Sequence, residues 1–403
     1  MRKTAIMIDF TQLASNPLTP KIEMPSGLSA EAKYIFSVTY TDPDAMQIKD
    51  FAKAIDTVIA REGLSLGPYP PALGHEGLRS FIADDLKKNR GIKILSENIF
   101  LSSGASGVTQ TLVAAFVNPG DVILMDEYCY HGSLNTFMRN GAEPIHIQMD
   151  EEGMIADALE NAIKQNIEHG IKPKFIYTIP VYHNPTGITF SLERRHQIVE
   201  ISKRYEIPII ENESYADFRI DGPKLPPSMM SLAENEGVIY LSAFTKLLGC
   251  GLRVGFGVFP ENARTPLENV FFGTGPSHLA SMAIFEYLSQ QKDEYVNGVV
   301  ASLKTKRDAM LRALGEYFPP SCSWTEPNGG MMIWVELPGK ANTWNALDRA
   351  VERGVKYNPG PIFRSDRGST NKLRLTYSQN TTTEIEEGIA ILADVFENEG
   401  LFS

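Results

Sequence analysis

The 403-residue chain lacks several features that mark particular classes of protein. Its only cysteines are Cys129, Cys250 and Cys322, an odd and sparse set that excludes a disulfide framework and indicates a reducing compartment. No apolar run reaches the ~20 residues that cross a bilayer. The amino-terminal stretch meets Asp9 too early for a secretory signal. We therefore expect a cytoplasmic globular protein.

An excess of positive charge is also absent. The 38 basic and 49 acidic side chains give a net charge of −11, which disfavours binding to nucleic acid or to an anionic membrane. The seven histidines show no spacing typical of a metal site. Neither G-x-G-x-x-G nor a Walker A motif occurs, so dinucleotide and P-loop binding are unsupported. We expect no metal, nucleic-acid or membrane partner.

Short β-branched runs alternate with amphipathic segments along most of the chain. The expected strands are 99–101, 122–125, 145–147, 175–179, 207–210, 238–241 and 255–258. Apolar residues recur at helical spacing in 42–62, 109–116, 155–168 and 192–205. This alternation predicts an α/β domain with a mostly parallel sheet flanked by helices. In such sheets ligands bind at the carboxyl ends of strands.

The pattern changes after about residue 295. A long expected helix over 294–318 precedes strand-like 329–337 and 372–378 and a last helix over 381–399. We therefore predict three parts, namely an amino-terminal arm that joins the small domain (1–45), a large domain (46–295) and a small α+β domain (296–403).

Lys246 lies between an expected strand and a glycine-rich stretch, in "LSAFTKLLGCGLRVGFG" (241–257). Burying a lysine is costly unless its amine is paired or deprotonated. A partly desolvated amine has a lowered pKa, which suits imine formation with an aldehyde. For any single lysine the alternative is an ordinary surface residue. S-x-x-K acyl-transfer chemistry is excluded because the residue three before Lys246 is Ala243.

Two further segments fit a site of this kind, although each alone is weak evidence. "LSSGASGVTQTL" (101–112) is a strand, a small-residue turn and a helix, so the N–H groups of Gly104, Ala105 and Ser106 are expected to face an anion. "VYHNPTGITF" (181–190) places Asn184 before a proline turn.

Together, these segments resemble the class I/II aminotransferases, fold type I enzymes that use pyridoxal 5'-phosphate (PLP). The motif S-F-S-K-x-x-x-P-G-L-R-x-G resembles residues 243–255, and N-P-T-G is intact at 184–187. P-G-x-x-F, L-R-L-x-[FY]-S and G-G-M-F-x-W resemble 359–363, 373–378 and 329–334. The similarity runs from about Tyr69 to Ser378. It implies a seven-stranded PLP-dependent transferase fold with a smaller α+β domain.

The resemblance also implies residue roles around PLP. Lys246 carries PLP through an imine and later moves a proton. Arg253 pairs with the phosphate, and Gly104, Ala105, Ser106 and Thr245 complete the phosphate cup. Tyr130 stacks on the pyridine ring, with neighbouring Tyr128 as a rival. Asn184 and Tyr215 hydrogen-bond the phenolic oxygen.

Three further residues are implied to act on the substrate or across an interface. Arg374 binds the α-carboxylate, Tyr40 lies near the substrate, and Tyr69 reaches the phosphate of a neighbouring subunit. The active sites are therefore expected to be shared in a homodimer.

The chain departs from the family at Asn212. The family's D-[DE]-x-Y places an aspartate against the pyridine nitrogen, whereas this chain reads Asn212-Glu213-Ser214-Tyr215. A neutral amide cannot supply the charge that holds the ring protonated. Glu213 is a possible substitute, but adjacent extended residues point to opposite sides, so the backbone would have to bulge. Ala243 is a second departure, because it lacks a hydroxyl for the phosphate.

The leading hypothesis is transfer of the amino group of an α-amino acid to a 2-oxo acid, in amino-acid metabolism or biosynthesis. The alternative is a PLP-dependent lyase, cyclising or replacement enzyme, racemase or oxidase, which Asn212 favours. Regulators that contain this domain are a third class. Specificity is expected to come from 38–40 and 271–279, where no extra arginine marks a dicarboxylate substrate. His131 and His278 are interpreted as packing or helix-start residues.

Overall fold

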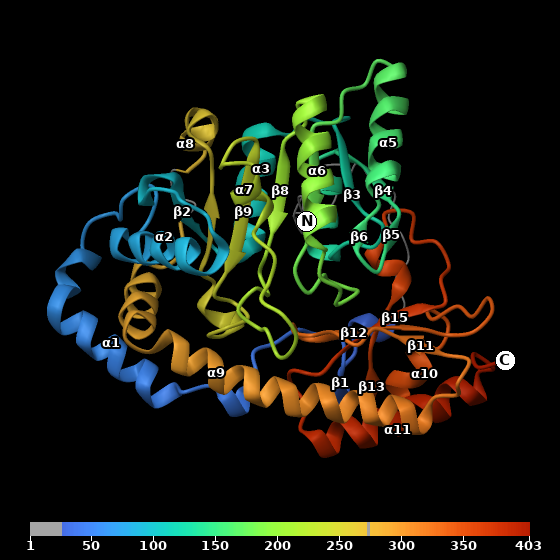
Figure 1. Ribbon diagram of the computed structural model, residues 1–403. Coiled ribbons are helices and arrows are strands. Elements are labelled where there is room, and N and C mark those ends of the chain that lie inside the picture. Colours follow the sequence, from blue (N-terminus) through green and yellow to red (C-terminus); the bar gives the residue numbers. More distant parts are fainter. Residues whose placement is uncertain (1–25, 272–274) are drawn as a thin grey trace, which may run out of the picture.

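The structure is a computed structural model, which describes residues 26–271 and 275–403. Its largest sheet has seven strands in the order β2-β10-β9-β8-β7-β3-β4 (Figure 1). These strands are β2 (Ile99–Ser102), β3 (Val122–Asp126), β4 (Glu143–Ile147), β7 (Phe175–Thr178), β8 (Ile209–Asn212), β9 (Val238–Ala243) and β10 (Gly255–Val258). Among them β10 alone runs antiparallel to its neighbours. The predicted mostly parallel, seven-stranded α/β sheet is confirmed.

Helices cover both faces of this sheet, and the strands are therefore apolar on both sides. In β3, Ile123 and Met125 belong to one hydrophobic cluster, whereas Val122 and Leu124 belong to another. The first cluster includes side chains of α3 (Gly104–Phe116), α4 (His131–Arg139) and α8 (Arg264–Glu268). The second includes side chains of α2 (Glu76–Arg90), α5 (Ala156–Glu168), α6 (Leu192–Tyr205) and α7 (Met229–Leu232).

A smaller antiparallel sheet, in the order β11-β12-β15-β14, lies in the carboxy-terminal part. Its strands are β11 (Ser323–Trp324), β12 (Met332–Glu336), β14 (Asn358–Pro359) and β15 (Lys372–Thr376). The neighbouring helices are α10 (Leu347–Glu352) and α11 (Thr382–Asn398), and α11 begins with a capping box between Thr381 and Glu384. Separately, β1 (Tyr34–Ile35) pairs in parallel with β13 (Val355–Lys356), so part of the predicted arm joins this region.

The remaining elements connect these parts. α9 (His278–Tyr317) runs along the molecule and packs against both α1 (Ile48–Glu62) and α11 (Figure 1). Its one non-helical residue is Gln291, with φ −145°. A small hairpin joins β5 (Met149–Asp150) to β6 (Gly153–Met154). Short 3-10 turns lie at Ser26–Leu28, Pro43–Ala45, Gly63–Leu66, Ser96–Asn98, Cys250–Leu252, Glu261–Ala263 and Gly360–Phe363.

Several element boundaries differ from the predictions. The helix expected at 294–318 is only the later part of α9, and α3 begins at Gly104 rather than at 109 because small residues form its first turn. α1 begins at Ile48, after a separate 3-10 turn. β8 begins one residue after Pro208, which has no N–H for a ladder. The domain boundaries at 45/46 and 295/296 stay predictions.

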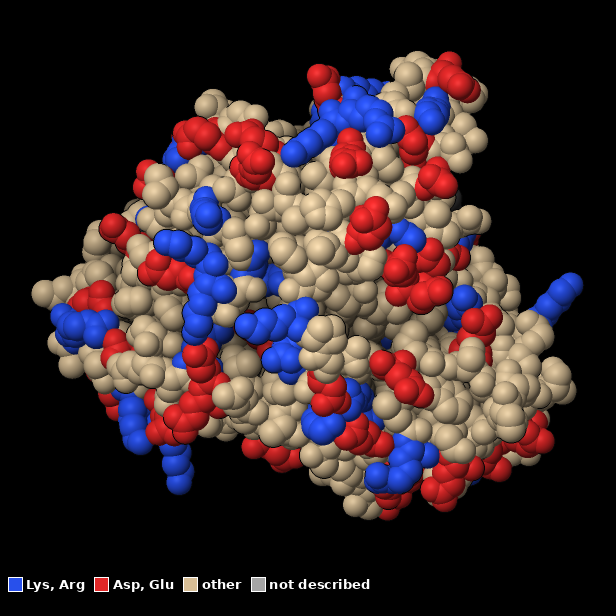
Figure 2. Space-filling model, in the orientation of Figure 1, with Lys and Arg blue, Asp and Glu red and all other residues tan. Residues whose placement is uncertain are grey.

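Charge is mixed on the face of the molecule that Figure 2 shows. Lysine and arginine side chains there lie among aspartates and glutamates. Within the two described ranges, every helix is too short or too polar to cross a membrane.

Candidate active site

The predicted site residues lie just beyond the carboxyl ends of five strands of the large sheet. Gly104 follows β2, Tyr130 follows β3, Asn184 follows β7, Tyr215 follows β8 and Lys246 follows β9. These ends share one edge of the sheet because the five strands point the same way. β15 of the smaller sheet adds Arg374 to the same place.

Lys246 is mostly buried in a polar environment. Burial lowers the pKa of its amine, and the nearby charges of Arg374 and Arg253 lower it further, against opposing contributions from Cys250 and Tyr130. The Lys246 Nζ lies 4.0 Å from the Cys250 Sγ. The Thr41 hydroxyl donates to the carbonyl oxygens of Thr245 (3.2 Å) and Lys246 (3.1 Å), which fixes the turn. A neutral amine is therefore accessible at lower pH than in a free lysine.

The amino terminus of α3 and the guanidinium of Arg253 together form a cradle that is suited to an anion. Gly104 has φ +71°, and a Cβ there would lie 2.9 Å from the Arg253 Nη2. That Nη2 donates to the Ser103 carbonyl at 2.8 Å. A Cβ on Gly255 would lie 2.5 Å from the carbonyl carbon of Gly104, so only glycine fits there.

Unpaired hydroxyls complete the cradle. The Oγ1 of Thr245 and the Oγ of Ser102 are buried and have no hydrogen-bond partner among the described residues. Ala105 and Ser106 lie in the first turn of α3, where backbone N–H groups point outward along the helix axis. Helix dipole, arginine and hydroxyls together favour a phosphate.

Asn184, Tyr215 and Arg374 form a continuous hydrogen-bonded chain. Asn184 Nδ2 donates to the Tyr215 hydroxyl at 3.1 Å, and Arg374 Nη1 donates to Asn184 Oδ1 at 2.8 Å. Arg374 Nη2 donates to the Ser37 carbonyl at 2.5 Å, and the Tyr215 hydroxyl donates to Thr39 at 3.3 Å. Burial raises the pKa of Tyr215, so this phenol stays protonated at neutral pH.

Arg374 is suited to binding a carboxylate. Burial lowers the pKa of its guanidinium to about 10, so it is charged at neutral pH. No carboxylate among the described residues pairs with it, and its buried Nε has no partner among them. A buried cation without a counter-ion is costly, which indicates a ligand anion at this place.

Tyr130 and His131 form a further wall of the site. Tyr130 caps α4, and a Cβ on Gly132 would lie 2.5 Å from its ring. The His131 ring lies 5.0 Å from that of Tyr130, and its Nδ1 is buried without a partner in the described chain. Burial, followed by the charges of Arg374, Arg367 and Lys246, lowers the pKa of His131 to about 3. The rival Tyr128 packs against Trp334 instead, with ring centroids 5.0 Å apart.

His131 and His278 begin α4 and α9, as interpreted from the sequence, and the His131 ring also packs against Phe363 with centroids 6.0 Å apart. His131 also lies next to the candidate site, because its ring is 5.0 Å from that of Tyr130 and the charges of Arg374 and Lys246 lower its pKa. Its position next to Tyr130 was the only signal for this role in the sequence.

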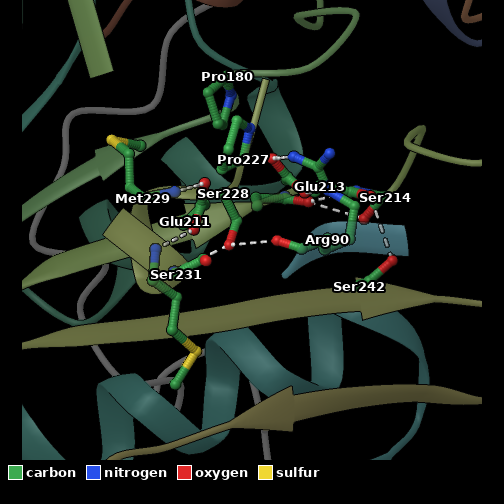
Figure 3. A network of polar contacts seen from close by, with 12 residues as sticks. Arg90, Pro180, Glu211, Glu213, Ser214, Pro227, Ser228, Met229, Ser231 and Ser242 are labelled. Carbon is green, nitrogen blue, oxygen red and sulfur yellow. Dashed lines mark hydrogen bonds and ion pairs between the residues drawn. The ribbon is translucent and has the colours of Figure 1, made fainter. Parts of the chain in front are cut away.

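Glu213 does not substitute for the missing aspartate. It is fully buried and accepts hydrogen bonds at 2.6 Å from both Nε and Nη2 of Arg90, and at 3.0 Å from Arg195 (Figure 3). Burial alone would raise the pKa of its carboxyl, but the two arginines outweigh burial and lower it. β8 pairs with β9 in unbroken register, so no bulge turns Glu213 toward the site. Asn212 is therefore the residue that occupies the place of the family's aspartate, and Glu213 does not share it.

Two predicted residues have exposed side chains in this single chain, although Thr39 and Thr41, the neighbours of Tyr40, bond to Tyr215 and to the Lys246 turn. Tyr69 is 94% exposed and Tyr40 is 48% exposed. Ala243 ends β9 and is buried. Residues 272–274 of the expected specificity loop, and 1–25 of the expected arm, lie outside the described residues. No group of three or more His, Cys, Asp or Glu in the described ranges is placed to hold a metal ion.

Comparison with known proteins identifies the family. The model for aminotransferase class I and II matches residues 38–392. The chain belongs to this family. This aminotransferase is similar to aromatic-amino-acid aminotransferase 1 of Thermococcus litoralis, at 30% identity over 362 residues covering 89% of this chain and 86% of that one.

Two other relatives extend the comparison. The uncharacterized HTH-type transcriptional regulator YisV of Bacillus subtilis is 33% identical over 82% of this chain and 67% of its own length. The solved α-aminoadipate aminotransferase LysN of Thermus thermophilus, complexed with N-(5'-phosphopyridoxyl)-L-leucine, has a TM-score of 0.88 and 26% identity, covering 97% of this chain and 99% of that one. The aminotransferase family and its PLP cofactor, both predicted from the sequence motifs, are confirmed.

Proposed function

We propose that this aminotransferase moves the amino group of an α-amino acid to a 2-oxo acid, with PLP attached at Lys246. One observation carries the proposal: a desolvated lysine amine is acted on by Arg253 at the start of α3 and by Arg374, which is buried without a carboxylate partner among the described residues. When bound, PLP supplies an aldehyde for the amino group and a ring that withdraws the electron pair left at Cα.

The residues present fit this cofactor. The phosphate needs several donors and a cation, and the α3 terminus, Arg253 and the unpaired Oγ1 of Thr245 offer them. The phenolic oxygen is assigned to the Asn184 and Tyr215 pair, which are already hydrogen-bonded to each other. The ring face is assigned to Tyr130.

The chain's own groups then have distinct tasks. Arg374 binds the α-carboxylate and so fixes the Cα–H bond relative to Lys246. The Lys246 Nζ accepts the Cα proton, because its lowered pKa makes the neutral amine available. His131 is neutral at physiological pH and offers its free Nδ1 to the substrate.

We propose aromatic or long apolar amino acids as amino donors. Phe363 packs on the Arg374 guanidinium at 5.1 Å and lies in a cluster with Trp334, Tyr128 and Ile362. This apolar wall next to the carboxylate-binding arginine accords with the aromatic and leucine-derived ligands named for the relatives.

We propose that the protein is a cytoplasmic homodimer that works in amino-acid metabolism and biosynthesis. Among the described residues, six of the eleven exposed large apolar side chains fall within residues 40–69, including Leu64 (95% exposed) and Tyr69 (94%). A second copy that covers this segment brings Tyr69 toward a phosphate. We keep the division into an arm (1–45), a large domain (46–295) and a small domain (296–403) as part of the proposal.

The test is a half-reaction without a 2-oxo acid. Purified holoenzyme mixed with phenylalanine or leucine is expected to convert its cofactor stoichiometrically to the pyridoxamine form, and a 2-oxo acid is expected to restore the original absorbance. Lys246→Ala is expected to prevent the conversion. Release of ammonia without the pyridoxamine form, or consumption of oxygen, favours the second candidate, a non-transaminating PLP enzyme, for which Asn212 is the supporting observation.

A further inference from the structure

The amide of Asn212 has a fixed orientation. Its Oδ1 accepts hydrogen bonds from the Ser214 backbone N–H at 3.2 Å and from the Ser214 hydroxyl at 2.7 Å. A backbone N–H can only donate, so the amide atom that faces it must be the oxygen. The opposite orientation would place two donors against each other.

The nitrogen of the same amide has one partner. Asn212 Nδ2 donates to the Tyr177 hydroxyl at 2.9 Å, and that hydroxyl lies 2.7 Å from the Ser133 Oγ. Burial raises the pKa of Tyr177, so it remains a phenol and can give its own hydrogen to Ser133. The Tyr177 oxygen is thereby available as an acceptor, and this agrees with the orientation that Ser214 imposes.

One bonding position of the amide is left over, and it is an N–H. Both lone pairs of Oδ1 are used by Ser214, and one of the two Nδ2 hydrogens is used by Tyr177. Asn212 is only 5% exposed, and its second N–H has no acceptor in the described part of the chain. A buried donor without an acceptor is costly, so this N–H marks the position of an acceptor on a ligand.

No carboxylate in this neighbourhood is free to supply a negative charge instead. Glu211 on β8 and Glu213 just beyond its end point to the side opposite to Asn212, and both are hydrogen-bonded there (Figure 3). Asp126, at the end of β3, accepts from Thr178 Oγ1 (2.9 Å) and from the Ile179 N–H (3.0 Å), and lies 3.2 Å from His183 Nε2.

We propose that Asn212 donates its free N–H to the pyridine nitrogen of PLP and thereby holds the ring unprotonated. Ser214 and Tyr177 are positioning residues that prevent the amide from turning its oxygen toward the ring. This inference rests on the proposed function, because the resemblance places residue 212 at the pyridine nitrogen. The ring is consequently a weaker acceptor of electrons than one held by a carboxylate.

The backbone offers a specific way to release the amide. The Ala216 N–H donates to the Glu213 carbonyl at 3.2 Å, so Ser214 occupies the second position of a turn, where proline is favoured. Ser214→Pro removes both donors to Asn212 Oδ1 and is compatible with the turn. Ser214→Ala is the matched control, since it removes the hydroxyl but keeps the backbone N–H.

The experiment is ¹⁵N NMR of the holoenzyme loaded with PLP labelled at the ring nitrogen. We expect the ring nitrogen of the wild type to give a signal in the range of unprotonated pyridine, and that of Asn212→Asp a signal in the pyridinium range. The signal of Ser214→Ala is expected to equal that of the wild type. The signal of Ser214→Pro is expected to move toward the pyridinium range. A pyridinium signal in the wild type would overturn the inference, and equal signals for the two Ser214 variants would overturn the positioning role. Mass spectrometry after borohydride reduction tests the proposed function separately. If the proposed function fails, no PLP adduct at Lys246 is found, whatever the NMR signals show.

Discussion

At the scale of single residues, the site concentrates positive charge with few carboxylates to balance it. Arg374 is buried and Lys246 is half-buried nearby, and the positive charges of both lower the pKa of His131. The nearby acidic groups Asp126 and Glu213 are committed to other partners. An anionic cofactor and an anionic substrate together neutralise this excess, which explains how a pocket so rich in cations can be maintained.

The first prediction concerns Arg374. Arg374→Lys removes the two-pronged donor set that now reaches Asn184 and Ser37, because an ammonium on a flexible stem cannot replace a planar guanidinium. We expect KM for the amino acid to rise roughly tenfold to a hundredfold, with a smaller change in kcat. Steady-state kinetics checks this. The exposed Arg353→Lys is the control, and equal KM values for the two variants would remove Arg374 from the carboxylate site.

At the scale of elements, the carboxyl edge of the large sheet and the start of α3 together form the proposed phosphate site. Helices of this length present unpaired N–H groups at their first turn. The approach of Arg253 to that turn depends on the absence of a side chain at Gly104. Packing between two backbone segments therefore decides whether the cradle exists.

The second prediction tests that packing. Gly104→Ala adds a Cβ that would lie 2.9 Å from Arg253 Nη2, at a residue with φ +71°, and we expect at least about tenfold weaker PLP binding. Gly120→Ala is the matched control. Gly120 also has positive φ (+89°), but a Cβ there meets nothing within 4 Å. Titration of the apoenzymes with PLP checks this, and equal loss in both variants would mean that backbone strain alone is responsible.

At the scale of the whole molecule, buried charges connect elements that are distant in sequence. Arg90 ends α2, Arg195 belongs to α6, and both bind Glu213 just beyond β8. Arg195 also donates to the carbonyl oxygens of Pro180 (2.9 Å) and Pro227 (3.2 Å). This network of hydrogen bonds and ion pairs fixes the face of β8 that is opposite to the Asn212 side chain.

The third prediction concerns Glu211, which accepts N–H bonds from Met229 (2.7 Å) and Met230 (2.9 Å). Burial and the charge of Glu213 raise its pKa from 4.5 to about 8, although Arg195 and the two N–H groups oppose the shift. Between these pH values the folded protein binds more protons than the unfolded chain, so this group's contribution to stability falls as pH rises. The loss between pH 5 and 8 is on the order of a few kcal/mol.

Glu211→Gln removes this dependence because the amide does not titrate. Holoenzyme unfolding in urea, followed at pH 5, 6, 7 and 8 at one protein concentration, is expected to show wild type losing stability relative to Glu211→Gln as pH rises. The exposed Glu397→Gln serves as the control. A constant difference between wild type and Glu211→Gln across this range would show that Glu211 is already ionised at pH 5.

The fourth prediction concerns the proposed dimer. Leu64→Glu places a charge within the exposed apolar segment 40–69, and we expect it to convert the dimer to a monomer of about half the mass and to weaken PLP binding. Leu95→Glu is the control, because Leu95 is also exposed (65%) but lies outside that segment. Light scattering after size exclusion measures the masses. A wild-type protein with a measured mass of 44.7 kDa, that of one chain, would contradict the dimer itself.

Much of this organisation follows from short-range patterns. Period-2 and period-3.6 spacing predicted the α/β sheet, and α6 agrees with its predicted range of 192–205. The motifs around Lys246, Asn184 and Arg374 identified residues that the fold indeed brings together. These features are local, because a strand, a turn and a helix start depend on neighbouring residues.

The sequence by itself determined the family, the cofactor and the absence of an aspartate at position 212. Only the tertiary structure decided where Glu213 points, which atom of the Asn212 amide is left over, and that His131 joins the site. Arg90 and Glu213 are 123 residues apart, and Asn212 and Tyr177 are 35 apart. Such pairs have no spacing rule, because their distance is set by how separate strands and helices pack and by which buried donors must find acceptors.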